Sequence, residues 1–244
     1  MSEHEIWLTK LFNDYLAGAG NAVLTMIGRQ AEPRPWVNYI TMQIFVVLLI
    51  MVVFALIRSR FSMDNPGGIQ HIFEETYLFL KGQADEIIGH HAHHYLYLCA
   101  TLFFFILISN LIGIIPSFES PTMFPQVTLG CALLTFLYYN VQGLREQGVV
   151  NYLKHFAGPV WWLAPLMIPI EIVGHLARPM SLTIRLFANM FAGEQVTMVF
   201  LGLTYAVIPV IFMGLHVFVS FLQAYIFTLL TMVYIGTAVE HEHS

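Results

Sequence analysis

Long apolar runs, separated by short polar segments, dominate the hydropathy pattern of the chain. The run Asn38–Ile57 is uncharged and about 20 residues long, which is what one helix needs to cross a bilayer. Two further runs, Tyr95–Ile115 and Val127 to about Leu144, are also uncharged. Trp36 and Tyr39 at the start of the first run are typical of a membrane–water interface. The pattern therefore predicts three membrane-spanning helices in the first 144 residues.

Two later runs, residues 166–203 and 206–239, are too long for upright spans. At 1.5 Å per residue, a helix over the first run would reach about 57 Å, nearly twice the hydrocarbon thickness. Each run must therefore tilt strongly, break, or lie partly along the membrane. The segment Gly202–Pro209 lies between them, and we expect it to join them as an antiparallel hairpin.

Two amphipathic segments complete the pattern. One is a short stretch around Ile6–Leu16, and Pro33 and Pro35 break any helix before the first span. The other follows the turn Asn65–Gly68 and covers about Ile69–Ile88, where apolar and charged residues alternate at helical spacing. We expect this second helix to lie along the membrane surface.

The predicted fold is all-α: a polytopic membrane protein with about five membrane helices and one interfacial amphipathic helix. Its last two helices are long and strongly tilted. We divide the chain into an external N-terminal segment (1–38), a single membrane domain (39–240) that includes an ion-path hairpin (160–240), and a C-terminal tail (241–244).

Composition supports a membrane protein. Hydrophobic residues make up 57% of the chain and charged residues 10%, against about 25% in a soluble domain, so a water-facing surface could not be covered. The ten Lys and Arg residues are scattered, which gives no support for nucleic-acid binding. Cys99 and Cys131 both fall in apolar runs and are interpreted as core residues, not as a disulfide or metal site.

The distribution of basic residues predicts the orientation. The loop 116–126 has no Lys or Arg, whereas the loop 145–158 carries Arg145 and Lys154. Because cytoplasmic loops are enriched in basic residues, we expect 58–94 and 145–158 to lie inside. The N-terminus is then outside and the C-terminus cytoplasmic.

The unusual feature is charge inside the run 166–203, which holds Glu171, Arg178, Arg185 and Glu194. Each charge costs at least about 2.5–3.5 kcal/mol at a bilayer centre, so such residues usually have a partner or a task. A salt-bridged helix pair is the purely structural explanation. The four charges in one stretch favour an ion path instead.

Helical spacing groups these residues. Glu171, Arg178 and Arg185 are seven residues apart and share a helix face, on which His175 and Asn189 also fall. The resulting polar stripe is about 27 Å long, with Pro179 as a point where it bends. Glu194 lies beyond this stripe, so carboxylates occupy both ends of the run.

The last run carries a second stripe, with His216, Ser220 and Gln223 at i, i+4 and i+7. In the predicted hairpin, Glu194 and His216 come level, and Arg185 and Gln223 lie nearly opposite each other. A Glu–His pair suits proton relay, because histidine titrates near neutral pH. Taken alone, His216 is more simply a hydrogen-bonded core histidine.

Three motifs in these stretches resemble a known family. Residues 178–194 read RPMSLTIRLFANMFAGE, which is similar to the long signature of subunit a of bacterial-type F-type ATP synthases. Leu222–Phe227 and Ser109–Pro116 resemble two further signatures of that family, and their order and spacing hold across roughly residues 36–240.

The resemblance implies a proton-conducting stator subunit in a bacterial inner membrane, beside a rotating ring of c subunits and the b subunits of a peripheral stalk. It implies that Arg185 faces the ring carboxylates, with Gln223 near it. Glu194 and His216 would line the outer half-channel, and Glu171 would lie toward the inner side. Such a subunit has no catalytic centre, metal or cofactor of its own, and the chain has no Gly-rich phosphate loop for ATP.

Other classes explain less. A membrane cytochrome could use His175 and His216 as haem ligands, but this leaves both arginines and Glu194 unexplained. Secondary transporters often show internal repeats, and hydrolases need a nucleophile–base pair or a HExxH motif; the sequence shows none of these. The segment His90–His94 has four histidines, which cannot all reach one metal from a helix, so a solvated interfacial segment is favoured.

Overall fold

The computed structural model describes residues 5–59, 67–89, 92–115, 118–157, 164–203 and 207–239, and all regular secondary structure in these residues is helical. The elements are α1 (Trp7–Met26), α2 (Asn38–Ser59), α3 (Gly68–Ile88), α4 (Ala92–Ile112), the short 3-10 helix η1 (Pro121–Met123), α5 (Pro125–Ala157), α6 (Ala164–Leu203) and α7 (Val207–Val239). The all-α prediction is confirmed.

Five of these helices are long and apolar enough to cross a membrane. They are Asn38–Arg58 in α2, Ala92–Ile112 in α4, Pro125–Gly148 in α5, Pro165–Leu203 in α6 and Pro209–Val239 in α7. This agrees with the predicted number of spans and with a multi-pass membrane protein.

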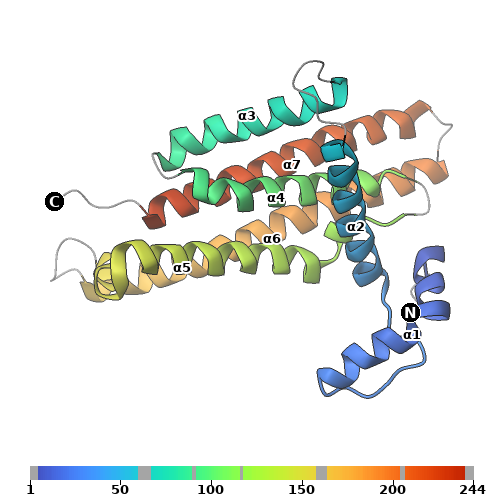
Figure 1. Ribbon diagram of the computed structural model, residues 1–244, viewed down its shortest axis with the longest axis horizontal. Coiled ribbons are helices and arrows are strands. Elements are labelled where there is room, and N and C mark those ends of the chain that lie inside the picture. Colours follow the sequence, from blue (N-terminus) through green and yellow to red (C-terminus); the bar gives the residue numbers. More distant parts are fainter. Residues whose placement is uncertain are drawn as a thin grey trace.

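The helices α6 and α7 form the predicted antiparallel hairpin. Near its closed end, the rings of Phe200 and Phe212 stack with centroids 4.5 Å apart. Figure 1 shows α4 to α7 running side by side, with α3 along α7, while α2 crosses this layer at a steep angle. The long hairpin helices therefore run at a steep angle to α2 (Figure 1). A strong tilt in the membrane, which would accommodate their length, stays a prediction.

Two segments differ from the sequence prediction. Residues 145–158 were expected to form a loop, but α5 continues to Ala157 across a break at Gly148, where φ is 74° and ψ is 157°. Glycine tolerates this left-handed backbone, so the chain changes direction and resumes a helix. Similarly, α1 continues past the predicted end at Leu16 to Met26, with a kink at Leu16.

The main core lies between α3, α4, α5, α6 and α7 and holds one side of the hairpin. Leu182, Leu186 and Met190 of α6 are buried in it, together with Phe227 of α7. The other side of α6 is open, since only 11% of the most apolar stretch of this helix is buried within this chain. The exposed side includes the large apolar residues Met180, Ile184 and Phe191.

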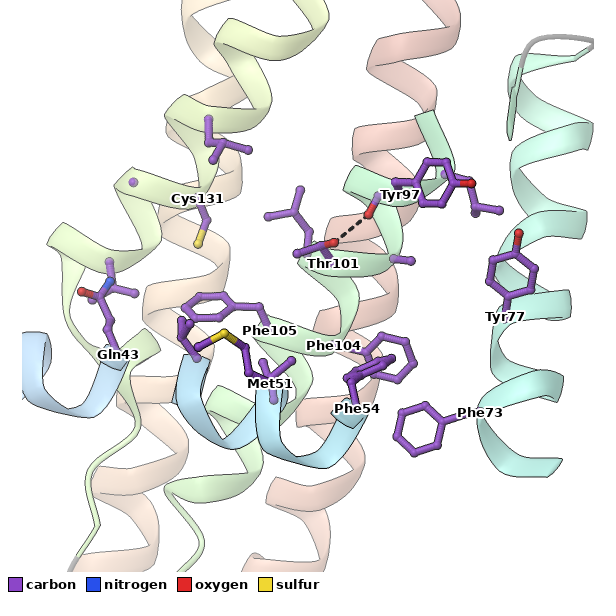
Figure 2. Close-up of a pocket in the computed structure, with 18 of the residues that line it drawn as sticks. Gln43, Met51, Phe54, Phe73, Tyr77, Tyr97, Thr101, Phe104, Phe105 and Cys131 are labelled. Atoms are coloured by element: carbon purple, nitrogen blue, oxygen red, sulfur yellow. Dashed lines mark hydrogen bonds between the residues drawn. The ribbon is translucent and has the colours of Figure 1, made fainter. Parts of the chain in front are cut away.

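An apolar cavity of about 890 Å³ lies between α2, α3, α4 and α5 (Figure 2). Its lining includes Met51, Phe54, Phe73 and Phe104, and no residue of α6 or α7. The cavity is therefore separate from the charged residues of the hairpin.

Candidate ion-translocation site

One end of the α6 stripe, which we predict to be the inner end, is a small polar cluster. The Glu171 Oε1 atom lies 3.9 Å from Arg178 Nη2 and 4.0 Å from His175 Nδ1. His175 Nε2 is hydrogen-bonded to Asn140 Oδ1 of α5 at 3.1 Å. Glu171, His175 and Arg178 therefore lie on one face of α6, as predicted, although Pro179 is inside the helix.

Arg178 is enclosed by its neighbours. Its guanidinium carbon lies 5.4 Å from the ring centroid of Tyr234 and 6.0 Å from that of Tyr139. The two rings come from α7 and α5, so Arg178 joins three helices through cation–π contacts and an acidic partner. Its surroundings explain how this charge is tolerated in an apolar helix.

Arg185 has different surroundings. Its side chain is partly exposed on α6, between the buried residues Leu182 and Leu186. Among the described residues it takes part in no ion pair or hydrogen bond. The hairpin therefore carries a permanent cation that is partly exposed within this chain.

One turn from Arg185, the two helices are linked by a hydrogen bond. The Asn189 Nδ2 atom donates to Gln223 Oε1 at 2.7 Å. Gln223 is thus level with Asn189, one turn from the predicted position opposite Arg185. Its side chain is 2% exposed, and its Nε2 atom has no hydrogen-bond partner among the described residues.

Toward the other end of α6, which we predict to be the outer end, Glu194 and His216 come level as predicted. The backbone of Gly193 lies against His216, because a Cβ atom on Gly193 would be 3.4 Å from ring atoms Cε1 and Nδ1. The turn of α6 that carries Glu194 therefore lies beside the histidine. Glu194 itself is partly exposed.

The α7 stripe carries a row of buried polar atoms without hydrogen-bond partners in the described part of the chain. They are His216 Nε2, Ser220 Oγ and Gln223 Nε2. Buried polar groups nearly always form hydrogen bonds with the protein or with ordered water. We therefore expect these atoms to form hydrogen bonds with water inside the hairpin.

A second polar cluster was not recognised in the sequence. Asn110 of α4 accepts a hydrogen bond from Thr122 at 2.5 Å and donates to the backbone oxygen of Ser220 at 3.5 Å. Ser120 shares a hydrogen bond with Thr122 at 2.7 Å. The cluster joins α4, η1 and α7. Ser109-Asn110 inside an apolar run was the available signal.

The haem alternative does not fit this arrangement. His175 lies at the inner cluster beside Asn140, whereas His216 lies beside Gly193. Positions 175 and 193 are 18 residues apart on α6, which is about 27 Å along a helix. The two histidines cannot ligate one iron. His90 and His91 of the histidine-rich segment, like residues 240–244, lie outside the described residues.

The fold and site define a multi-pass α-helical membrane protein with ionisable groups inside a tilted hairpin, a feature of ion pathways. The family model for the ATP synthase A chain matches residues 40–236. The chain belongs to this ATP synthase subunit a family, so it is a proton-translocating membrane-sector subunit that works in a complex with other subunits.

Relatives match nearly the whole chain. The ATP synthase subunit a of Solibacter usitatus is 62% identical, covering 96% of this chain and 100% of the relative. That of Koribacter versatilis is 51% identical over 98% and 99% of the two chains. That of Geobacter sulfurreducens is 41% identical over 82% and 86%.

Proposed function

We propose that this chain is the stator subunit that supplies two aqueous half-channels and presents Arg185 to the carboxylates of a rotating c ring. The observation that carries the proposal is the partly exposed guanidinium of Arg185, which has no ion-pair partner among the described residues. It lies between two polar ends of one helix, whereas Arg178 in the same helix is paired and packed.

A fixed cation at this position has two effects on protons. It attracts a carboxylate on a passing rotor and favours the ionised form, so the carboxylate releases its proton. It also repels hydronium, so protons cannot leak directly from one half-channel to the other. Both effects need a charge that is never lost, and a guanidinium stays protonated at any working pH.

The polar groups on either side supply the two routes. Glu194 and His216, followed by Ser220 and Gln223, form the outer route toward Asn189 and Arg185. Glu171 and His175 form the inner route. With the N-terminus outside and the C-terminus cytoplasmic in a bacterial inner membrane, the first route opens outward and the second to the cytoplasm.

The exposed apolar side of α6, with Met180, Ile184 and Phe191, is where the c ring would bind. The b subunits of a peripheral stalk would bind to other helices. The chain itself would have no catalytic centre or cofactor, and ATP would be made elsewhere in the complex.

Replacing Arg185 tests the proposal. Arg185→Ala should abolish proton-driven ATP synthesis and ATP-driven pumping, while the complex still assembles and passive proton leak persists or rises. Arg185→Lys should also be poor, because ammonium is more strongly hydrated and lacks the planar guanidinium group. Proton pumping in inverted vesicles is the measurement, and normal pumping by Arg185→Ala would overturn the mechanism.

A further inference from the structure

A carboxylate that the proposed function does not use lies near the outer end of the hairpin. Glu119 is partly exposed in the segment between α4 and η1. The next residue, Ser120, donates a hydrogen bond to the Ser109 backbone oxygen at 2.9 Å. Gly113 allows the close approach, since a Cβ atom there would lie 2.8 Å from Ser120 Cβ. The backbone beside Glu119 is therefore fixed against α4.

Neighbours from the N-terminal part also hold this segment. The Asn38 Nδ2 atom at the start of α2 donates to Glu119 Oε2 at 3.3 Å. Phe118 stacks on Phe45 of α2 with centroids 5.5 Å apart, and contacts Trp7 of α1 edge-on. The Glu119 carboxylate is thus held at one position.

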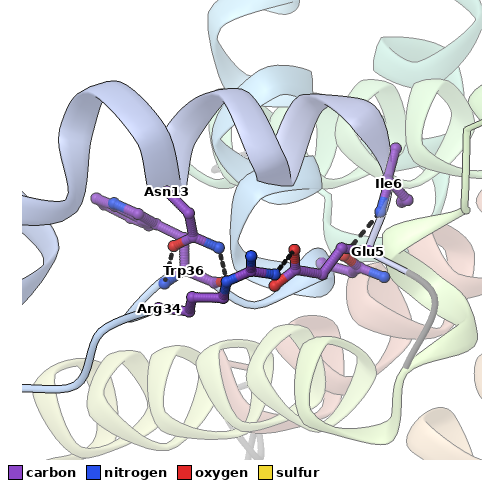
Figure 3. Close-up of polar contacts among 6 residues, drawn as sticks. Glu5, Ile6, Asn13, Arg34 and Trp36 are labelled. Atoms are coloured by element: carbon purple, nitrogen blue, oxygen red, sulfur yellow. Dashed lines mark hydrogen bonds and ion pairs between the residues drawn. The ribbon is translucent and has the colours of Figure 1, made fainter. Parts of the chain in front are cut away.

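The helix α1 strengthens this arrangement. Figure 3 shows Asn13 paired with the Trp36 backbone, with Asn13 Nδ2 3.1 Å from Trp36 O and Trp36 N 3.0 Å from Asn13 Oδ1. Arg34 and Glu5 form an ion pair at 2.5 Å. These contacts fasten the N-terminal segment to the start of α2, next to Asn38.

Glu119 faces the proposed outer route. Ser120, the next residue, shares a hydrogen bond with Thr122, which donates to Asn110, and Asn110 in turn donates to the backbone oxygen of Ser220 in the α7 stripe. The short helix η1 also packs against α6, the helix that carries Glu194. The sequence 116–126 holds no Lys or Arg that could neutralise these carboxylates. Arg34 of the neighbouring N-terminal segment is paired with Glu5. Carboxylates at a channel mouth create a negative potential, which concentrates protons there.

We propose that Glu119 is the proton-collecting group at the outer mouth and supplies Glu194 through water. The Glu119 carboxylate takes one proton from hydronium in the outer solution. It then gives that proton to a water molecule, which passes a proton to the Glu194 carboxylate, and Glu119 returns to its anionic form. This inference rests on the proposed function, because it assumes that Glu194 belongs to the outer route.

The test uses the whole complex reconstituted in vesicles, with the outer side of the chain facing a lumen of set pH. Glu119→Gln keeps an oxygen for the Asn38 amide but removes the charge. At constant total proton-motive force, ATP synthesis should fall about three- to tenfold at alkaline outer pH, and less at acidic outer pH where protons are abundant. Glu119→Asp should restore most of the rate.

Two comparisons make the result decisive. Glu32→Gln removes an exposed carboxylate from the N-terminal segment and should leave synthesis at the wild-type rate at every pH. Equal rates for Glu119→Gln and wild type at every outer pH would overturn the inference. So would a loss that is independent of outer pH and is not rescued by Asp, since that marks a structural role. If Glu194→Gln and Arg185→Ala also act normally, the proposed function fails as well.

Discussion

The two arginines of α6 show how one residue type serves two purposes. Arg178 has Glu171 as a partner and two tyrosine rings around its guanidinium. Arg185 has no such partner among the described residues. A satisfied charge stabilises the helices it joins, whereas an unsatisfied one at an open surface is available to another molecule.

The surroundings of Arg178 predict a loss of stability more than a loss of function. Arg178→Ala removes cation–π contacts worth about 0.5–2 kcal/mol and leaves Glu171 without its partner. We expect the purified complex to dissociate at a lower temperature, while pumping stays well above that of Arg185→Ala. Equal loss of pumping in the two variants would show that the two cations act together.

Glu194 and His216 give the second prediction at this scale. Glu194→Gln should slow proton translocation by at least about tenfold, because the amide cannot exchange a proton, but it should not block assembly. His216→Ala should slow it as well. Their double variant should be little worse than the more defective single one, since both serve one route. Wild-type pumping rates in both single variants would make the pair structural.

At the scale of elements, the segment between α4 and η1 depends on Gly113. A Cβ atom there would lie 2.8 Å from Ser120 Cβ and 3.3 Å from the Ser120 backbone nitrogen, so Gly113→Ala must displace the segment. We expect it to destabilise the protein by about 1–3 kcal/mol and to slow pumping. Thermal stability of the complex in detergent is the measurement.

The matched control is Gly130→Ala in α5, where an added Cβ atom would meet nothing within 4 Å. Because alanine favours a helix over glycine by up to about 1 kcal/mol, this change should be neutral or slightly stabilising. If both substitutions have the same effect, the close approach at Gly113 does not matter.

The helices could be predicted from the sequence because the spacing of residues on a helix face depends only on neighbouring positions in the chain. A spacing of seven predicted that Glu171 and Arg178 share a face, and the two side chains lie 3.9 Å apart. The prediction of which residues of α6 and α7 lie opposite each other was less accurate. The hairpin turn and the crossing angle of the two helices also determine this register. Gln223 consequently bonds Asn189, one turn from the predicted level.

Loop-borne contacts could not be predicted in this way. Glu119 reaches Asn38 from 81 positions away, and Thr122 reaches Asn110 by folding back on α4. Neither contact leaves a periodic signal, since a loop path depends on packing against several elements. The end of α5 was misjudged for a related reason, because the break at Gly148 redirects the helix without ending it.

At the scale of the molecule, other helices of this chain cover one side of the α6–α7 hairpin and leave the other side exposed. The buried side packs on α4 and α5, while most of α6 remains exposed within this chain. An open apolar side with a cation that no described residue pairs is suited to a partner that brings both an apolar surface and a carboxylate. If the proposed c ring binds there, it could move past this side while the core keeps Arg185 in place.

Orientation is a property of the whole molecule, and water-borne thiol reagents can test it. The basic segment 145–158 and the Lys/Arg-free segment 116–126 predict that the inner cluster opens to the cytoplasm. In a background with Cys99 and Cys131 replaced by Ala, Glu171→Cys and His175→Cys should react with a charged reagent from the cytoplasmic side. Glu194→Cys should react from the outer side, because in the proposed mechanism Arg185 separates the two routes.

Labelling of right-side-out and inverted vesicles, read by mass spectrometry, separates the possible results. A matched control is Leu186→Cys, which is on α6 between the two routes but is 0% exposed, and should react from neither side. Reaction of Glu171→Cys only from outside, with Glu194→Cys reacting only from inside, would reverse the orientation but keep two routes. Reaction of all three polar positions from one side would instead mean a single aqueous cavity. A cation between two routes would then have no barrier to maintain, and the role proposed for Arg185 would fail with it.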